Sequence, residues 1–460
     1  MPGIEISESA KTTLTQLFIE TTSSEKLSGT IDLSDFSVLL EANIKNCDIE
    51  SYDGSENQEL LFLINNKLEK FPSMFKMPNL RLLQIADDTR ITGTIPSLDF
   101  NTKLEEFVVA DLNLNGTIPN LKNCVELRKF QVHKNNFSGN LPTLSACTKL
   151  ELVDISNNNI NGALDVLPFH GALSTFNAGN NTITGNIPNL DALTALRDFN
   201  VFENSFSGPI PPLSSNLSLK FFRSYGNTSI SGPFPAFVSA GDIQNTNLDT
   251  FDARQNNLSG PLPPLSTTPN LTFFVSTDGS LSGHLPEFNQ ATGLTNFEFT
   301  NNLFRGTIPP LSANTALKHL NLNICALSGQ FPSVENNTNL IALRFNNNKN
   351  KLGSPGISGN VPTVSACTSL RVLDVADNSL TGYDGGPFPN SIENIQLGGN
   401  NFNSTTINMF LSTILDSVPN SPSPRGVTRQ CNIGNNALPT GQGLIDRAQL
   451  KTNGWLFNDL

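Results

Sequence analysis

The chain has 460 residues, of which 28 are Lys or Arg and 40 are Asp or Glu, so its net charge at pH 7 is −12. That balance argues against a nucleic-acid-binding surface, which needs clustered basic residues. Hydrophobic residues make up 37% of the chain, enough for a packed core, which excludes a wholly disordered protein. Aromatic usage is lopsided, with 31 Phe against 3 Tyr and 1 Trp, and indicates a fixed structural place for Phe.

The N-terminal residues 1–25 contain no basic stretch followed by an apolar run, so a secretory signal is not expected. The longest apolar run, Leu60–Ile64, is far shorter than the ~18 residues of a membrane-spanning helix. We expect residues 1–38 to form an N-terminal cap and a first degenerate repeat. Localisation is left open between a virion or extracellular surface and the cytoplasm.

A unit of about 23 residues, LxxFxVxxNxFSGxIPxLxxxTx, then repeats along most of the chain. Its first Leu or Ile falls at positions 80, 104, 127, 150, 173, 196, 219, 248, 271, 294, 317, 340, 370 and 392. Weaker units begin at 14, 39, 60 and 428, which gives about 18 turns. The alternation of apolar residues at the fourth and sixth places is typical of a short strand with one buried face.

The ninth place of the unit usually holds Asn, at the point where the strand must turn. An Asn amide can both donate to and accept from backbone groups that the turn leaves unpaired. A Gly follows four residues later, where a Cβ would crowd the bend. We therefore predict a structural Asn ladder made of Asn135, Asn158, Asn181, Asn204, Asn256, Asn302 and Asn378.

The repeated unit resembles leucine-rich repeats, and its L-x-G-x-I-P segment is typical of the plant-type subclass. The resemblance covers roughly Leu14 to Leu438 and implies a curved, right-handed superhelical solenoid with a parallel β-sheet on its concave face and few helices. The paired-Cys caps of plant extracellular members are absent. The Gly454–Trp455 tail is similar to tails that close repeats in bacterial and phage proteins, which favours a bacterial or phage origin.

We expect the solenoid proper to span residues 39–404. Residues 405–460 are predicted to hold a helical insertion, a last repeat and a capping helix. Thr406–Val418 has helical spacing, and Gly443–Asp459 is expected to form the cap, with Gly454 as its stop and Trp455 over the last turn.

Catalytic motifs are missing from the sequence, which contains no HExxH, P-loop, CxxC or GxSxG, so neither an enzyme nor a cofactor is expected. The four histidines lie in different turns without ligand-like spacing. Asp374, Asp377 and Asp384 are too few for Ca²⁺, which takes six to eight oxygen ligands, and no metal site is predicted. Cys124 and Cys147 occupy the same place in neighbouring turns. The sequence allows two interpretations of them, a disulfide bridge or apolar packing without a bridge.

The third, fifth, seventh and eighth residues of each turn should project from the concave sheet toward solvent. In one zone, consecutive turns place aromatic residues and Arg there, and we predict a ligand-binding patch of Phe202, Phe221, Arg223, Tyr225, Asp252, Arg254 and Phe273. Contiguous exposed aromatic surface usually marks an interaction site; packing between turns without a partner is the alternative. Insertions at residues 236–247 and 349–355 break the repeat and are expected to form loops.

These features favour a non-enzymatic scaffold that binds a protein or glycan on a cell surface through its concave face, as a phage or bacterial receptor-binding or adhesin protein. A structural accessory virion component, with other virion proteins as partners, is the alternative. A plant-type receptor ectodomain is the second alternative. Neither nucleic acid binding nor membrane insertion is expected.

Overall fold

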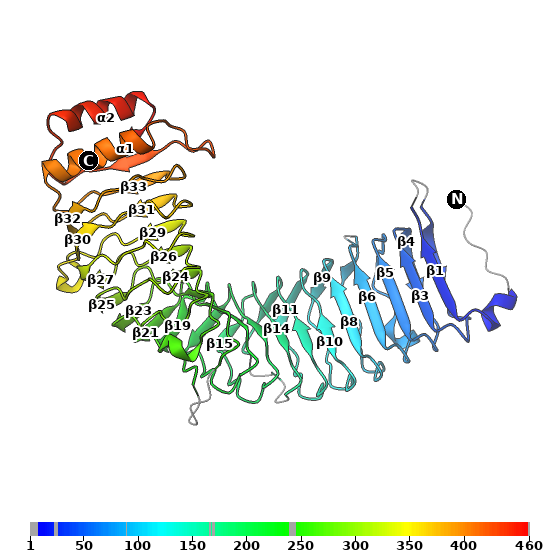
Figure 1. The fold of residues 1–460 in the computed structure, drawn as a ribbon. Helices are drawn as coiled ribbons and strands as arrows, with labels where there is room; N and C mark the ends of the chain where they lie inside the picture. The colour runs from blue at the N-terminus through cyan, green and yellow to red at the C-terminus, as the bar shows by residue number, and fades with distance from the viewer. Residues whose placement is uncertain are drawn as a thin grey trace. The chain divides into compact units, whose positions relative to one another are not determined.

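The computed structural model describes residues 8–22, 26–88, 90–164, 167, 171–238 and 245–458. The described residues form a parallel β-solenoid of about 19 turns with few helices (Figure 1), which confirms the predicted fold class. The chain divides into two units, Met1–Asn227 and Thr228–Leu460. Residues 239–244 of the first insertion, and His170, lie outside the described residues.

The first unit contributes one strand per turn to a main parallel sheet. These strands are β1 (Gln16–Glu20), β3 (Glu41–Lys45), β5 (Leu60–Ile64), β6 (Leu82–Ala86), β8 (Glu106–Ala110), β10 (Lys129–Gln131), β12 (Leu152–Asp154), β14 (Thr175–Asn177), β16 (Asp198–Asn200) and β18 (Phe221–Arg223). Shorter second strands are β2 (Ser28–Asp32), β4 (Asp48–Asp53), β7 (Thr92–Gly93), β9 (Asn113–Gly116), β11 (Asn136–Asn140), β13 (Asn159–Asn161), β15 (Thr184–Asn186) and β17 (Ser205–Gly208). Two 3₁₀ turns, η1 (Glu8–Thr12) and η2 (Met74–Lys76), complete it.

The repeat period fixes the register of this sheet, because equal places of successive turns pair. Phe176 of β14 lies opposite Phe199 of β16, which lies opposite Phe222 of β18. The three rings stack with centroids 5.6 and 5.7 Å apart and are fully buried. Strands about 4.8 Å apart bring equivalent rings into stacking range, so the Phe residues of these three successive turns build a stacked column inside the coil. Val153 takes the same place in the preceding turn.

The second unit repeats the arrangement. Its main-sheet strands are β20 (Thr250–Asp252), β22 (Phe273–Val275), β24 (Asn296–Glu298), β26 (His319–Asn321), β29 (Ala342–Arg344), β31 (Val372–Asp374), β33 (Asn394–Gln396), β34 (Gln430–Asn432) and β35 (Leu456–Phe457). The second strands are β19 (Ser229–Pro233), β21 (Asn257–Gly260), β23 (Ser280–Gly283), β25 (Leu303–Gly306), β27 (Ala326–Leu327), β28 (Gly329–Gln330), β30 (Ile357–Val361) and β32 (Ser379–Tyr383). The 3₁₀ turns are η3 (Leu265–Thr267) and η4 (Lys351–Gly353).

Two helices lie at the C-terminal end of the second unit, α1 (Ser404–Ser417) and α2 (Gln442–Thr452) (Figure 1). Asn403 caps α1, since its side chain accepts the Thr406 amide at 2.9 Å. The chain leaves α2 through Gly454, whose φ of 93° suits glycine. Trp455 is buried, and its Nε1 donates to the Val418 carbonyl at 3.1 Å. No helix of the described residues is both long and apolar enough to cross a bilayer.

Candidate binding site

The predicted Asn ladder lies inside the turns and bonds the backbone. Asn158 Nδ2 donates to the carbonyl oxygens of Val132, Ile155 and Ser156 at 3.0, 3.1 and 3.2 Å. Its Oδ1 accepts the amide of Phe137 at 3.0 Å. The same four-bond pattern occurs at Asn135, Asn181, Asn204, Asn302 and Asn378, while Asn256 is buried. Each Asn therefore ties its own turn to the preceding one.

A second ladder, which sequence reasoning missed, stands three residues before the first Leu of a turn. Asn314 Nδ2 donates to the carbonyl oxygens of Phe288 and Ala291 at 3.1 and 2.9 Å. Asn101 and Asn337 donate in the same way, and the three side chains are buried. Among the described residues, the Oδ1 atoms of these three side chains have no hydrogen-bond partner.

Cysteines take the second-ladder position in three turns. The thiol of Cys147 donates to the Leu121 carbonyl at 3.4 Å, and that of Cys367 donates to the Val334 carbonyl at 3.6 Å. Cys124 and Cys147 are free and buried, so no bridge joins them. Burial raises the pKa of the Cys124 thiol to about 12 and that of the Cys147 thiol to about 11. These thiols are structural donors and not nucleophiles.

Phe202 and Tyr225, two aromatic residues of the predicted patch, form a stacked pair on the solvent-facing side of the main sheet. The rings of Phe202 and Tyr225 lie 4.8 Å apart at an interplanar angle of 8°. Both side chains are half-buried, so each packs partly against its neighbouring turn while part of it reaches solvent, as the predicted outward places allow. Phe202 lies over Gly179, where a Cβ would come within 2.5 Å of the ring. The missing side chain at residue 179 thus lets the Phe202 ring lie against the neighbouring turn.

An Arg-centred cluster stands beside that pair on β16 and β18. The Arg223 guanidinium lies 4.9 Å from the centroid of the Phe221 ring. Its Nη1 donates to Asn200 Oδ1 at 2.9 Å and lies 3.8 Å from Asp198 Oδ1. Burial raises the pKa of Asp198, and the Arg223 charge opposes that shift. A half-buried cation held over a ring and beside an amide is pre-positioned to meet an anionic or carbonyl group.

The second unit carries the other three residues of the predicted patch. Arg254 donates from Nε and Nη2 to the two carboxylate oxygens of Asp252, at 2.9 and 2.7 Å. Its guanidinium lies 5.9 Å from the Phe273 ring. Asp252 is only 3% exposed, which differs from the expectation that its side chain projects into solvent. Arg254 lies in the turn that follows β20, and its guanidinium pairs with both oxygens of the buried Asp252 carboxylate, which holds Arg254 in place.

Two of the three acidic residues considered for metal binding, Asp374 and Asp384, bond to Asn side chains of the protein. Asp374 accepts from Asn346 Nδ2, and Asp384 Oδ1 accepts from Asn360 Nδ2 at 2.7 Å. Burial raises the pKa of Asp374. In the described part of the chain, no group of three His, Cys, Asp or Glu side chains could hold a metal ion.

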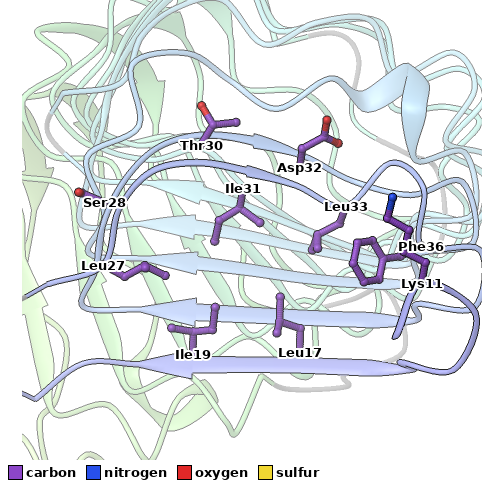
Figure 2. Close-up of a pocket in the computed structure, with 10 residues that line it drawn as sticks. All are labelled: Lys11, Leu17, Ile19, Leu27, Ser28, Thr30, Ile31, Asp32, Leu33 and Phe36. Atoms are coloured by element: carbon purple, nitrogen blue, oxygen red, sulfur yellow. The ribbon is translucent and has the colours of Figure 1, made fainter. Parts of the chain in front are cut away.

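A cavity of about 210 Å³ with a mixed polar and apolar lining lies in the first turn of the first unit. Figure 2 shows Leu17 and Ile19 of β1 facing Leu27 and Ile31 across it, with Lys11 at one side. Among the described strands, β1 pairs with β3 alone. The cavity therefore lies at the first described strand of the main sheet, and its lining residues are not those of the aromatic patch.

Sequence comparison finds no matching protein-family model and no matching curated protein. Solved structures do match. The plant peptide hormone receptor RGFR1 in complex with RGF2 has a TM-score of 0.77 and 22% identity, over 96% of this chain and 71% of that chain. The Arabidopsis receptor kinase HAESA, in complex with the peptide hormone IDA and the co-receptor SERK1, has a TM-score of 0.65 and 19% identity. The match covers 97% of this chain and 81% of that chain.

The LRR ectodomain of the plant membrane receptor kinase GASSHO1/SCHENGEN3 from Arabidopsis thaliana has a TM-score of 0.62 and 21% identity, and this chain covers 57% of its length. The fold is that of a leucine-rich-repeat solenoid. At these identities the likeness concerns the fold alone.

Proposed function

We propose that the protein is a non-enzymatic recognition scaffold that binds a peptide or protein segment on the solvent-facing side of its main sheet, the face predicted to be concave. The observation that carries the proposal is the patch on the first unit, where Phe202 stacks on Tyr225 and Arg223 lies over Phe221. Aromatic residues and Arg supply most of the binding energy at protein interfaces. A packed solenoid presents them pre-ordered, so little conformational entropy is lost on binding.

The second unit offers a smaller group of the same composition. Arg254, held by Asp252, lies beside the Phe273 ring. We propose that this group extends recognition in the second unit, with Asp252 as the positioning residue. Arg254 is exposed and would meet a carboxylate or a backbone carbonyl of the ligand.

The class of ligand is argued from chemistry and from the neighbouring structures. RGFR1 and HAESA are both seen with peptide hormones, which supports an extended peptide and a plant-type receptor ectodomain. The Gly454–Trp455 tail supports the other setting, a phage or bacterial surface protein whose ligand is a cell-surface protein or glycan. The same stacked rings could face a sugar, so a glycan is the alternative outcome of the test.

Selection against the immobilised full chain tests the proposal, with a random-peptide display library and a glycan array as probes. The double variant Phe221→Ser/Tyr225→Ser should lose binding of selected peptides by about thirtyfold or more, since hot-spot residues contribute about 2 kcal/mol or more. The matched control is Lys129→Ser/His133→Ser, which changes the same third and seventh places in the turn that begins at Leu127.

Wild-type binding that persists in the Phe221→Ser/Tyr225→Ser variant would contradict a patch-based site. Equal loss in the matched control would place recognition elsewhere on the face. Enrichment on the glycan array alone would replace the peptide with a sugar.

A further inference from the structure

Two phenylalanines of the first unit lie in solvent, away from the sheet face. Phe75 is 67% exposed and Phe100 is 56% exposed. Phe100 directly precedes the second-ladder residue Asn101, and the following turns place Asn123 and Ala146 at the equivalent position. The repeat thus puts a polar or small residue where this turn has a ring, and core packing does not account for it.

The two exposed rings contact each other and form a notch. Their centroids lie 5.1 Å apart and their planes meet at 83°. Together with Pro78 they line a groove of about 570 Å³. Perpendicular rings present one face and one edge to the same space, which suits a compact apolar ring inserted between them. The groove lies where the chain turns back toward β6 and β8.

The rim of this groove is acidic. Asp35 and Glu56 are exposed lining residues, and Lys76 is the basic one. Lys76 Nζ lies 3.1 Å from Asp53 Oδ1, and Lys11 Nζ lies 3.2 Å from Asp35 Oδ2. With these pairs formed, three carboxylates face two ammonium groups, and the charge that remains is negative. A basic group on a ligand would complement it.

We propose that this groove binds a proline-rich, basic peptide segment in the polyproline II conformation. Proline rings fill notches between aromatic side chains, and the conformation is ordered before binding, so the entropy cost is small. An Arg or Lys next to the prolines would meet Glu56 at the rim, the carboxylate that remains after the two ion pairs are formed. The groove does not use the sheet-face patch, and its occupation is independent of the proposed function.

Fluorescence anisotropy of the full chain tests the proposal, with a labelled peptide of ten prolines flanked by two arginines at each end. The wild type should bind saturably, and Phe75→Ser and Phe100→Ser should each weaken binding at least tenfold. A peptide with every second Pro replaced by Ala should bind at least tenfold more weakly. Glu56→Lys should weaken binding several-fold, and the weakening should diminish at high salt.

Phe18→Ser is the matched control, because Phe18 is 60% exposed in the same unit and lies outside the groove. It should bind like the wild type, and thermal unfolding should show that all variants stay folded. The proposal is overturned by absent wild-type binding, by equal binding of the Ala-substituted peptide, or by full affinity in Phe75→Ser and Phe100→Ser. It is also overturned if sedimentation shows that these rings instead mediate self-association of the chain.

Discussion

The two ladders inside the solenoid use the same side chain to different extents. In the first ladder, Asn158 uses both ends of its amide, with three carbonyl acceptors and one amide donor. In the second ladder, Asn314 uses only its NH₂ group, and its Oδ1 has no partner among the described residues. A Cys thiol, which can donate but accepts weakly, replaces Asn in the second ladder at Cys124, Cys147 and Cys367, and in the first ladder at Cys47 and Cys325. Cys325 donates to the Phe299 and Asn323 carbonyls, so both ladders accept a donor-only side chain. The ladders differ in the acceptor that Asn adds in the first ladder, as Asn158 does for the Phe137 amide.

The largest expected effect is in the first ladder. Asn158→Ala leaves the buried Phe137 amide without its acceptor and removes a donor from three carbonyls, of which Ser156 keeps the Lys134 amide. We therefore expect a local loss of about 3 kcal/mol or more. Native-state hydrogen exchange at the Phe137 amide should be at least 100-fold faster. The control is Asn159→Ala, which changes the exposed neighbour and should leave that amide protected.

The second ladder should be more tolerant. Asn314→Ala removes a donor from two carbonyls and orphans no backbone amide, so we expect a loss of about 1–2 kcal/mol in the free energy of unfolding. Asn314→Cys should recover at least half of it, since the thiol donates as Cys147 does. Urea unfolding measures the free energy of unfolding of Asn314→Ala and Asn314→Cys. A loss in Asn314→Ala as large as that in Asn158→Ala would break the distinction between the ladders.

The smallest effect concerns pH. Burial raises the pKa of the Cys147 thiol from its ordinary value of 9.0 to about 11. The unfolded thiol therefore ionises first, and the stability that this group contributes is present below pH 9 and is lost between pH 9 and 11. From pH 8 to pH 10 the wild type should lose about 1 kcal/mol more than Cys147→Ala. Urea unfolding of both proteins at pH 8 and pH 10 measures this difference. An equal loss of unfolding free energy in the wild type and in Cys147→Ala would contradict a raised pKa of the buried thiol.

Sequence periodicity was sufficient for the fold and for most of the first ladder, because Asn recurs at the ninth place of most units. The buried positions of Asn158 and Phe176 were predicted from their places in the repeated unit. The second ladder was missed because Asn, Cys and other residues share its position, and no single letter repeats. About 19 turns are observed where about 18 were predicted, since the end strand β35 has only two residues, Leu456–Phe457.

The patch was predictable in composition but not in geometry. Phe202, Tyr225 and Phe221 stand at outward places of the unit, as predicted from their phase. Their partial burial depends on ring stacking and on the bare backbone at Gly179, which a linear pattern does not encode. The burial of Asp252 follows from its bidentate pairing with Arg254, a rotamer choice that spacing alone leaves open.

Hydroxyl-radical footprinting of the full chain tests the central claim most directly, with a peptide selected from the display library as ligand. Oxidation of Phe202, Phe221 and Tyr225 should fall several-fold when the peptide binds, while oxidation of the exposed Phe18 should not change. Unaltered oxidation of the three patch rings at saturating peptide would contradict recognition through this face.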